Sequence, residues 1–193
     1  MSGPKEAQDA ADLAGREAEA ARRVPPGILV LMGVSGSGKS TVAKELQRVL
    51  GWPFQEGDDL HPPANVEKMR LGQPLDDEDR LPWLQACAHW IDGQLAANQP
   101  GIITCSNLKR AYRDITIDSR PGVDLVYLKG DEHVIQKRLR ERVHRYMPPT
   151  LLGSQFETLE EPGPDEHPIT IIVHGPVGET VLQLLEKLAA RSA

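Results

Sequence analysis

The sequence predicts an α/β fold in which a central parallel sheet of about five strands carries helices on both faces. Two observations predict it. Short, continuous apolar runs alternate along the chain with stretches whose apolar residues recur at helical spacing. That alternation is typical of parallel strands joined by right-handed helical crossovers. In addition, a glycine-rich segment, GVSGSGKS, stands directly between the first apolar run and the first helical pattern.

The predicted elements follow in chain order. The expected strands are ILVLM (28–32), a short and less regular strand around Phe54, GIITC (101–105), DLVYL (124–128) and ITIIV (169–173). Apolar spacing predicts helices over residues 40–50, 81–99, 109–118, 131–145 and 179–190. The tryptophans of the second helix, Trp83 and Trp90, are expected to pack in the core.

The composition fits one globular domain without a membrane segment. The chain has 193 residues, of which 39% are hydrophobic and 26% charged, enough for a single core. A formal net charge of -6 argues against nucleic acid or an anionic membrane as the main partner. No apolar run reaches the roughly 18 residues of a membrane helix. Only two cysteines are present, too few for a disulfide framework, so a cytoplasmic location is expected.

The first 24 residues are expected to form a flexible tail, frayed or partly helical. They are rich in Ala, Glu and Arg, and the acidic residues argue against a transit peptide, which would be poor in acids. Pro25 and Pro26 end this segment. Residues 25–193 are then expected to form the globular domain.

The glycine-rich segment predicts a nucleoside triphosphate site. It matches G-x-x-x-x-G-K-[ST] and lies between a predicted strand and a predicted helix, as the pattern requires. Its glycines let backbone amides turn toward phosphate oxygens. Lys39 is expected to contact the β- and γ-phosphates, and Ser40 to bind Mg²⁺. The expected nucleotide-binding residues are Gly33, Val34, Ser35, Gly36, Ser37, Gly38, Lys39, Ser40 and Thr41. The alternative is a merely flexible Gly/Ser turn.

The acid that assists the chemistry must come from elsewhere than the third predicted strand. Many phosphate-loop proteins carry an aspartate at the end of that strand for Mg²⁺, but GIITC ends at Cys105 and Ser106. The guanine-binding pattern NKxD is also missing, which argues against a regulatory GTPase.

The stretch EGDDLHPPANVEKM, residues 56–69, provides such acids after the short strand around Phe54. Ligands of α/β sheets bind outside the carboxyl ends of the strands. Asp58 is therefore expected to accept a proton from, or orient, a substrate hydroxyl and to join the Mg²⁺ shell. His61 is expected to bind another hydroxyl or to be a simple loop residue, and Asp59 to be a turn residue. A solvated loop that Pro62 and Pro63 interrupt is the alternative.

Four segments together resemble the signature blocks of the gluconokinase family: GVSGSGKST, EGDDLHPPANVEKMRLGQPLDDEDRLPWL, CSNLKRAYRD and SQFETLEEP. The resemblance implies a three-layer P-loop kinase fold with a mobile lid near residues 141–156. It also implies a cytoplasmic homodimer that transfers the γ-phosphate of ATP to the 6-hydroxyl of D-gluconate, giving 6-phosphogluconate. The alternatives are a kinase for another hydroxylated acid, such as shikimate, and a non-catalytic ATP-binding sensor.

A sugar acid requires cations for its carboxylate, and the segment NLKRAYRD contains Lys109, Arg110 and Arg113. On a helix Lys109 and Arg113 share one face, whereas Arg110 points away. We therefore expect Lys109 and Arg113 to bind the carboxylate together; a solvated basic face paired with acids is the alternative. Arg80 is expected either to approach the substrate or to pair with a neighbouring aspartate.

The lid segment supplies further arginines. The resemblance implies that Arg142 reaches the transferred phosphate when the lid closes and that Arg138 lies near the nucleotide base. The alternative is that these arginines are solvated charges on a surface helix. The sequence departs from the family at Ile117, where an arginine is usual, so one possible anion contact is missing.

Overall fold

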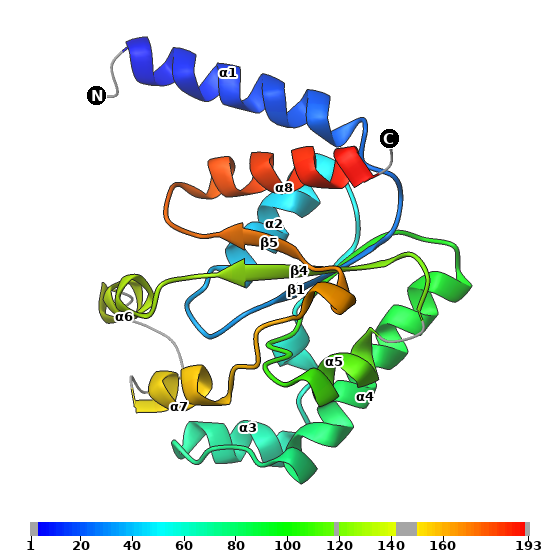
Figure 1. Cartoon of the computed structure of the whole chain (residues 1–193), viewed down its shortest axis with the longest axis vertical. Coiled ribbons are helices and arrows are strands. Elements are labelled where there is room, and N and C mark those ends of the chain that lie inside the picture. The colour runs from blue at the N-terminus through cyan, green and yellow to red at the C-terminus, as the bar shows by residue number, and fades with distance from the viewer. Residues whose placement is uncertain (1–3, 118–119, 142–149, 192–193) are drawn as a thin grey trace.

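The computed structural model describes residues 4–117, 120–141 and 150–191 and contains a five-stranded parallel sheet in the order β2-β3-β1-β4-β5 (Figure 1). All neighbouring strands run parallel, so the predicted sheet is confirmed. The strands are β1 Ile28–Met32, β2 Phe54–Gln55, β3 Gly101–Thr104, β4 Val123–Lys129 and β5 Ile169–Ile172.

The helices are α1 Pro4–Ala21, α2 Lys39–Leu50, α3 Pro63–Arg70, α4 Asp77–Ala96, α5 Arg110–Thr116, α6 Glu132–Glu141, α7 Thr150–Thr158 and α8 Val177–Arg191. Two short 3₁₀ turns, η1 Gly57–Leu60 and η2 Pro164–Glu166, complete the described elements. No helix in these described ranges combines the length and the hydropathy needed to cross a bilayer.

The core has two parts, one on each face of the sheet, because successive side chains of a strand point to opposite faces. Leu29 and Leu31 of β1 pack toward α2 and α8. Ile28 and Val30 pack toward α4, where Trp83 is 1% exposed. The central strand is therefore buried on both sides, which explains its uninterrupted apolar run.

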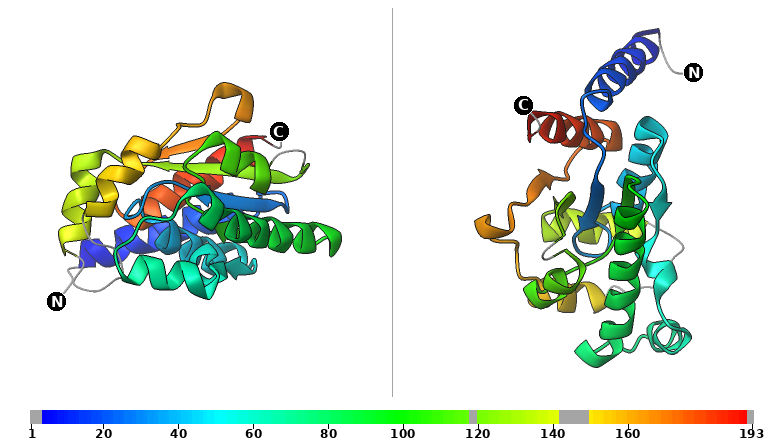
Figure 2. Two further views of the ribbon diagram at one scale, coloured as in Figure 1. Left: turned by 90° about the horizontal axis from the view of Figure 1, so that it is seen from below. Right: turned by 90° about the vertical axis from the view of Figure 1, so that its right-hand side faces the viewer.

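The N-terminal segment is the main departure from the expectation. Where a frayed or partly helical tail was expected, residues 4–21 form one continuous helix, and Figure 2 shows it on the outer side of α8. Leu13 and Ala20 pack against the core, and the Arg48 guanidinium donates to the buried Glu17 carboxylate at 2.9 Å. Contacts with distant parts of the chain hold this helix in place, and its own sequence did not reveal them.

The two prolines of the acidic stretch begin a helix instead of interrupting the chain. Pro62 is the N-cap of α3, and Pro63 is its first residue, where the missing amide hydrogen is not needed and the fixed φ suits a helix. Asp76 caps α4, because its side chain accepts from the Asp79 amide while the Asp79 carboxylate accepts from the Asp76 amide. The Gly57 amide of η1 donates to the Thr104 hydroxyl at the end of β3, and the Asn65 side chain of α3 donates to the Asp79 carbonyl in the first turn of α4 at 2.6 Å.

Candidate active site

The loop between β1 and α2 has the backbone of a phosphate cradle. Gly33, Gly36 and Gly38 have φ values of 139°, 82° and 96°, which favour glycine. A Cβ atom on Gly33 would lie 2.7 Å from the Leu128 carbonyl oxygen. The first amides of a helix have no acceptor within it, and those of α2 begin directly after Gly38. The loop therefore presents donors to an anion.

Two side chains in this loop also fit a phosphate ligand. The Lys39 ammonium donates to the carbonyl oxygens of Gly33 at 2.9 Å and Val34 at 3.1 Å. The Ser37 hydroxyl is buried and has no hydrogen-bond partner in the part of the chain that the structure describes. An unpaired buried hydroxyl is costly, so a polar ligand at the loop would stabilise it.

Acidic groups lie close enough to Lys39 to act on its charge. Burial lowers the pKa of the Lys39 ammonium, and the carboxylates of Asp58 and Glu56 oppose that shift. Asp58 lies in η1 and is exposed. The turn that carries Asp58 lies at the end of β3, where the Gly57 amide donates to the Thr104 hydroxyl at 3.0 Å, and the phosphate loop is held at the same strand end by the Gly33 amide, which donates to the Ser106 carbonyl at 3.3 Å. Asp59 is an exposed residue of the same turn, as Asp58 is.

Glu56 is a candidate that sequence reasoning missed. Its carboxylate accepts a short hydrogen bond from the Thr104 hydroxyl at the end of β3, and that hydroxyl also accepts from the Gly57 amide at 3.0 Å. The signal was available, because Glu56 is the first acid after β2 and stands at the carboxyl end of a strand. Thr104 therefore fixes the acidic turn against the sheet.

The acidic turn is also held from the side of α4. The Trp83 indole donates to the Gly57 carbonyl at 2.7 Å, and the His61 ring stacks on it. The Asn65 side-chain nitrogen lies 3.5 Å from His61 Nδ1. Burial, with a smaller contribution from the Arg80 charge, lowers the pKa of His61 from 6.5 to about 4. His61 is therefore neutral at pH 7, and a neutral imidazole both donates and accepts hydrogen bonds.

A cleft of about 500 Å³ adjoins this group and is lined by Leu75, Asp76, Asp77, Glu78, Arg80, Lys109, Tyr112 and Thr158. The charged ends of Arg80 and Lys109 lie 5.9 Å and 5.4 Å from the centre of the Tyr112 ring. The Asp77 carboxylate accepts from Lys109 at 2.7 Å and from the Tyr112 hydroxyl at 2.5 Å. The structure therefore brings Arg80 and Lys109 together around one aromatic ring.

Arg80 keeps much of its donor capacity for other partners. Its Nε donates to the Leu75 carbonyl at 3.3 Å. Within the described ranges, Arg80 forms no ion pair with Asp76 or Asp77. The alternative that Arg80 only neutralises a neighbouring aspartate is therefore not what the structure shows.

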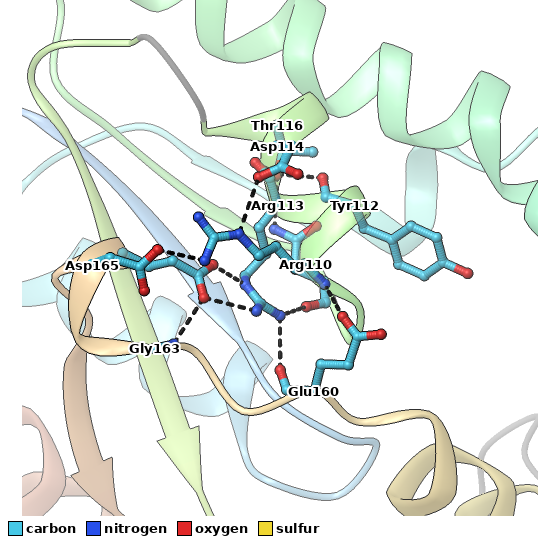
Figure 3. A network of polar contacts seen from close by, with 10 residues as sticks. Arg110, Tyr112, Arg113, Asp114, Thr116, Glu160, Gly163 and Asp165 are labelled. Atoms are coloured by element: carbon cyan, nitrogen blue, oxygen red, sulfur yellow. Dashed lines mark hydrogen bonds and ion pairs between the residues drawn. The ribbon is translucent and has the colours of Figure 1, made fainter.

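The prediction that Lys109 and Arg113 share one helix face and bind the carboxylate together is wrong. Lys109 is the N-cap of α5 in extended conformation, so the two residues do not share a helix face. Arg113 is 3% exposed, and its guanidinium forms a two-point ion pair with Glu166 (Figure 3). It also donates to the carbonyls of Asn107 and Glu160 at 3.1 Å and 2.9 Å. The Arg113 guanidinium is therefore engaged by protein acceptors, and it is not among the residues that line the cleft of Arg80 and Lys109.

The lid expectations fall mostly outside the described residues. Arg142 lies outside them, and only the backbone of Arg138 is described, in α6. Of the segment near residues 141–156, the structure describes the backbone of Glu141 and residues 150–156 of α7. In this helix the Gln155 side chain accepts from the Ser35 amide at 2.7 Å. Ile117, the departure from the family pattern, caps the end of α5 and packs against the core.

The donor set suits Mg²⁺ held jointly with phosphates. In the described ranges, no group of three or more His, Cys, Asp or Glu side chains is arranged to hold a metal ion alone. Mg²⁺ commonly binds one or two carboxylates together with waters and substrate phosphates. The Ser40 hydroxyl in the first turn of α2 and the carboxylates that act on Lys39 are donors of this kind.

A parallel sheet, a phosphate loop at the end of β1 and an acid-lined cleft define a P-loop kinase fold. A family model described as an AAA domain matches residues 28–161. The chain is 48% identical over 155 residues to the gluconokinase of Gluconobacter oxydans, covering 80% of this chain and 87% of that protein. It is 47% identical over 145 residues to the thermoresistant gluconokinase of Escherichia coli, covering 75% and 83%.

A solved structure agrees. The gluconokinase from Sinorhizobium meliloti matches with a TM-score of 0.77 and 43% identity, covering 87% of this chain and 94% of that one. The chain therefore belongs to the AAA domain family that the model describes and, within it, to the gluconokinases. The resemblance of the four sequence segments is confirmed.

Proposed function

We propose that this protein transfers the γ-phosphate of ATP to the 6-hydroxyl of D-gluconate, giving 6-phosphogluconate. One observation carries the proposal: the turn that carries Asp58 and the phosphate loop are both held at the end of β3, because the Gly57 amide donates to the Thr104 hydroxyl at 3.0 Å and the Gly33 amide donates to the Ser106 carbonyl at 3.3 Å. An acid that receives a hydroxyl proton must stand beside the phosphate that is transferred. The relatedness to gluconokinases supports the choice of acceptor.

On the phosphate side, Lys39 and the loop amides neutralise negative charge on the β- and γ-phosphates. Ser40 and Asp58 would hold Mg²⁺, with Glu56 close by, and the ion would supply positive charge to the same oxygens. Lys39 now donates to carbonyls of its own loop. A bound triphosphate replaces those weaker acceptors with charged ones.

On the acceptor side, the oxygen of the substrate hydroxyl attacks the γ-phosphorus of ATP. The bond between that phosphorus and the β,γ-bridging oxygen breaks, and ADP leaves with this oxygen. Asp58 orients the hydroxyl and takes its proton. Neutral His61 hydrogen-bonds a further hydroxyl, since its pKa is about 4. Arg80 and Lys109, whose charged ends both lie near the Tyr112 ring in the cleft, bind the carboxylate at the other end of the sugar acid.

We also propose the setting in which this occurs. Residues 25–193 form the kinase domain, with a lid near residues 141–156, and α1 is an added helix on its outer side. The protein acts in the cytoplasm as a homodimer, with small molecules and not nucleic acid or membrane as partners. The formal charge of -6 supports the last point.

A coupled ADP-release assay with Mg²⁺ and ATP over several acceptors tests the reaction. We expect turnover with D-gluconate and little with shikimate, other sugar acids or nucleoside monophosphates. Product NMR should show phosphorus on the 6-oxygen, and 6-deoxygluconate should bind without turnover. Turnover with shikimate or a nucleotide and none with gluconate would assign a different kinase; no turnover with any acceptor would favour an ATP-binding sensor.

A further inference from the structure

Helix α7 is attached to the phosphate loop by a contact that the mechanism above does not use. The Gln155 side-chain oxygen accepts from the Ser35 amide at 2.7 Å, across 120 positions of sequence. Ser35 is the third residue of the loop pattern. A side chain that holds a loop peptide restricts the orientation of that peptide, and the cradle depends on such orientations.

Apolar packing supports the same attachment. Leu152, Gln155 and Phe156 recur at helical spacing and share one face of α7, and Leu159 follows directly after the helix ends at Thr158. In one small cluster, Leu152 is buried with Val34 of the phosphate loop, while Phe156 and Leu159 pack against it. Gln155 is the polar member of this otherwise apolar face, which is the sequence signal that marks it.

The same helix reaches the acceptor cleft. Thr158 lines that cleft together with Arg80 and Lys109. It lies one turn after Gln155, and its hydroxyl donates to the Ser154 carbonyl at 2.7 Å. The chain after α7 is then fixed by the Glu160 amide, which donates to the Leu108 carbonyl at 2.8 Å. Helix α7 therefore contacts both the loop that holds phosphate and the cleft proposed for the acid.

We propose that Gln155 is a positioning residue that couples acceptor binding to nucleotide binding through α7. This inference rests on the proposed function, because it takes the cleft as the acceptor site. An acceptor that contacts Thr158 fixes α7, and Gln155 then fixes the Ser35 peptide in the orientation that suits the triphosphate. Coupling between two bound ligands is reciprocal, so ATP strengthens acceptor binding by the same factor.

Calorimetric titration of a non-hydrolysable ATP analogue with Mg²⁺, with and without gluconate, measures this coupling. In the unaltered chain we expect gluconate to tighten analogue binding by about fivefold or more. In Gln155→Leu, the ratio of the analogue's Kd without gluconate to its Kd with gluconate should fall to within about twofold of unity. Leucine fits the apolar face, so thermal unfolding should show a folded protein. Gln155→Asn, which is polar but too short to reach Ser35, should behave in the same way.

The matched control is Glu157→Gln, an exposed position on the same helix, which should keep the full ratio. Equal ratios in the unaltered chain and both Gln155 variants would overturn the inference, and so would a ratio of one in the unaltered chain. Gluconate turnover by the unaltered chain is measured in parallel. If turnover is present but coupling is not, only this inference fails; if turnover with gluconate is absent, the proposed function and this inference fail together.

Discussion

The imidazole of His61 stacks on the indole of Trp83, with ring centroids 4.3 Å apart and ring planes 11° from parallel. Trp83 is fixed in turn, because its indole nitrogen donates to the Gly57 carbonyl in the acidic turn. One core tryptophan therefore supports both a candidate substrate-binding histidine and the loop that carries Asp58. The same side chain therefore packs in the core and, through the stacking and the hydrogen bond, supports the candidate site.

This environment predicts a pH-dependent stability. The pKa of His61 is lowered from 6.5 to about 4, so below pH 6.5 the unfolded chain binds a proton that the folded chain does not. Stability is fully present above pH 6.5 and falls as the pH drops toward 4, by about 2 kcal/mol after solvent screening is allowed for. Urea unfolding at pH 7 and pH 4.5 measures the difference.

The variant His61→Asn should show a smaller loss between these two pH values, because the titrating group is gone. His89→Asn, at an exposed position of α4, should keep the loss. Equal losses in His61→Asn and the unaltered chain would assign the effect to other groups.

Arg113→Met should destabilise the fold without a specific effect on gluconate binding. Its ion pair with Glu166 is buried, with side chains 3% and 10% exposed, and removing one partner leaves an unpaired buried carboxylate that costs about 3–5 kcal/mol. Urea unfolding measures the loss of stability, and KM for gluconate measures binding by the folded fraction.

Arg110→Met is the matched control. Arg110 pairs with Asp165 at the surface, with side chains 51% and 60% exposed, so stability should change little. A selective rise of KM for gluconate in Arg113→Met, with stability unchanged, would restore the substrate role that the structure argues against.

Asp58→Asn should lower kcat by about 10²- to 10⁴-fold, because the amide cannot accept the hydroxyl proton. The ATP analogue should still bind, since the loop amides and Lys39 are intact. Asp59→Asn, in the same exposed turn, should retain turnover. If Asp58→Asn keeps kcat within about threefold of the unaltered enzyme, the proton-accepting role is lost.

Gly57→Ala should lower both stability and turnover. A Cβ atom at Gly57 would lie 1.8 Å from the Thr104 carbonyl oxygen, so the acidic turn must move away from β3 and carry Asp58 with it. Gly93→Ala in α4 meets nothing within 4 Å and should raise stability by up to about 1 kcal/mol, because alanine favours helix. Thermal unfolding and the ADP-release assay report both effects; undiminished turnover in Gly57→Ala would mean that the turn tolerates displacement.

The strands and the phosphate loop were predictable because their signals are local. An uninterrupted apolar run of four or five residues, such as Ile28–Met32, by itself predicts a strand that is buried on both faces. The phosphate loop likewise needs only a strand before it, glycines within it and a helix after it. The position of Asp58 followed from these, since strand ends in one parallel sheet meet at one edge.

The sequence did not predict which charged side chains line the cleft and which are buried in ion pairs. Lys109 and Arg113 look equivalent in NLKRAYRD, yet one lines the cleft and the other is buried against Glu166, 53 positions along the chain. Similarly, nothing in residues 4–21 indicates that Glu17 meets Arg48 and that the helix rests on α8.

The sequence by itself therefore determined the parallel sheet and the phosphate loop, because the signals of both lie within a few neighbouring positions. Only the tertiary structure decided which cations remain available for a substrate, that Thr104 holds Glu56, and that Gln155 contacts Ser35. The physical reason is that a side chain's availability depends on the partners that folding brings to it. Those partners lie tens of residues away and leave no periodic signal.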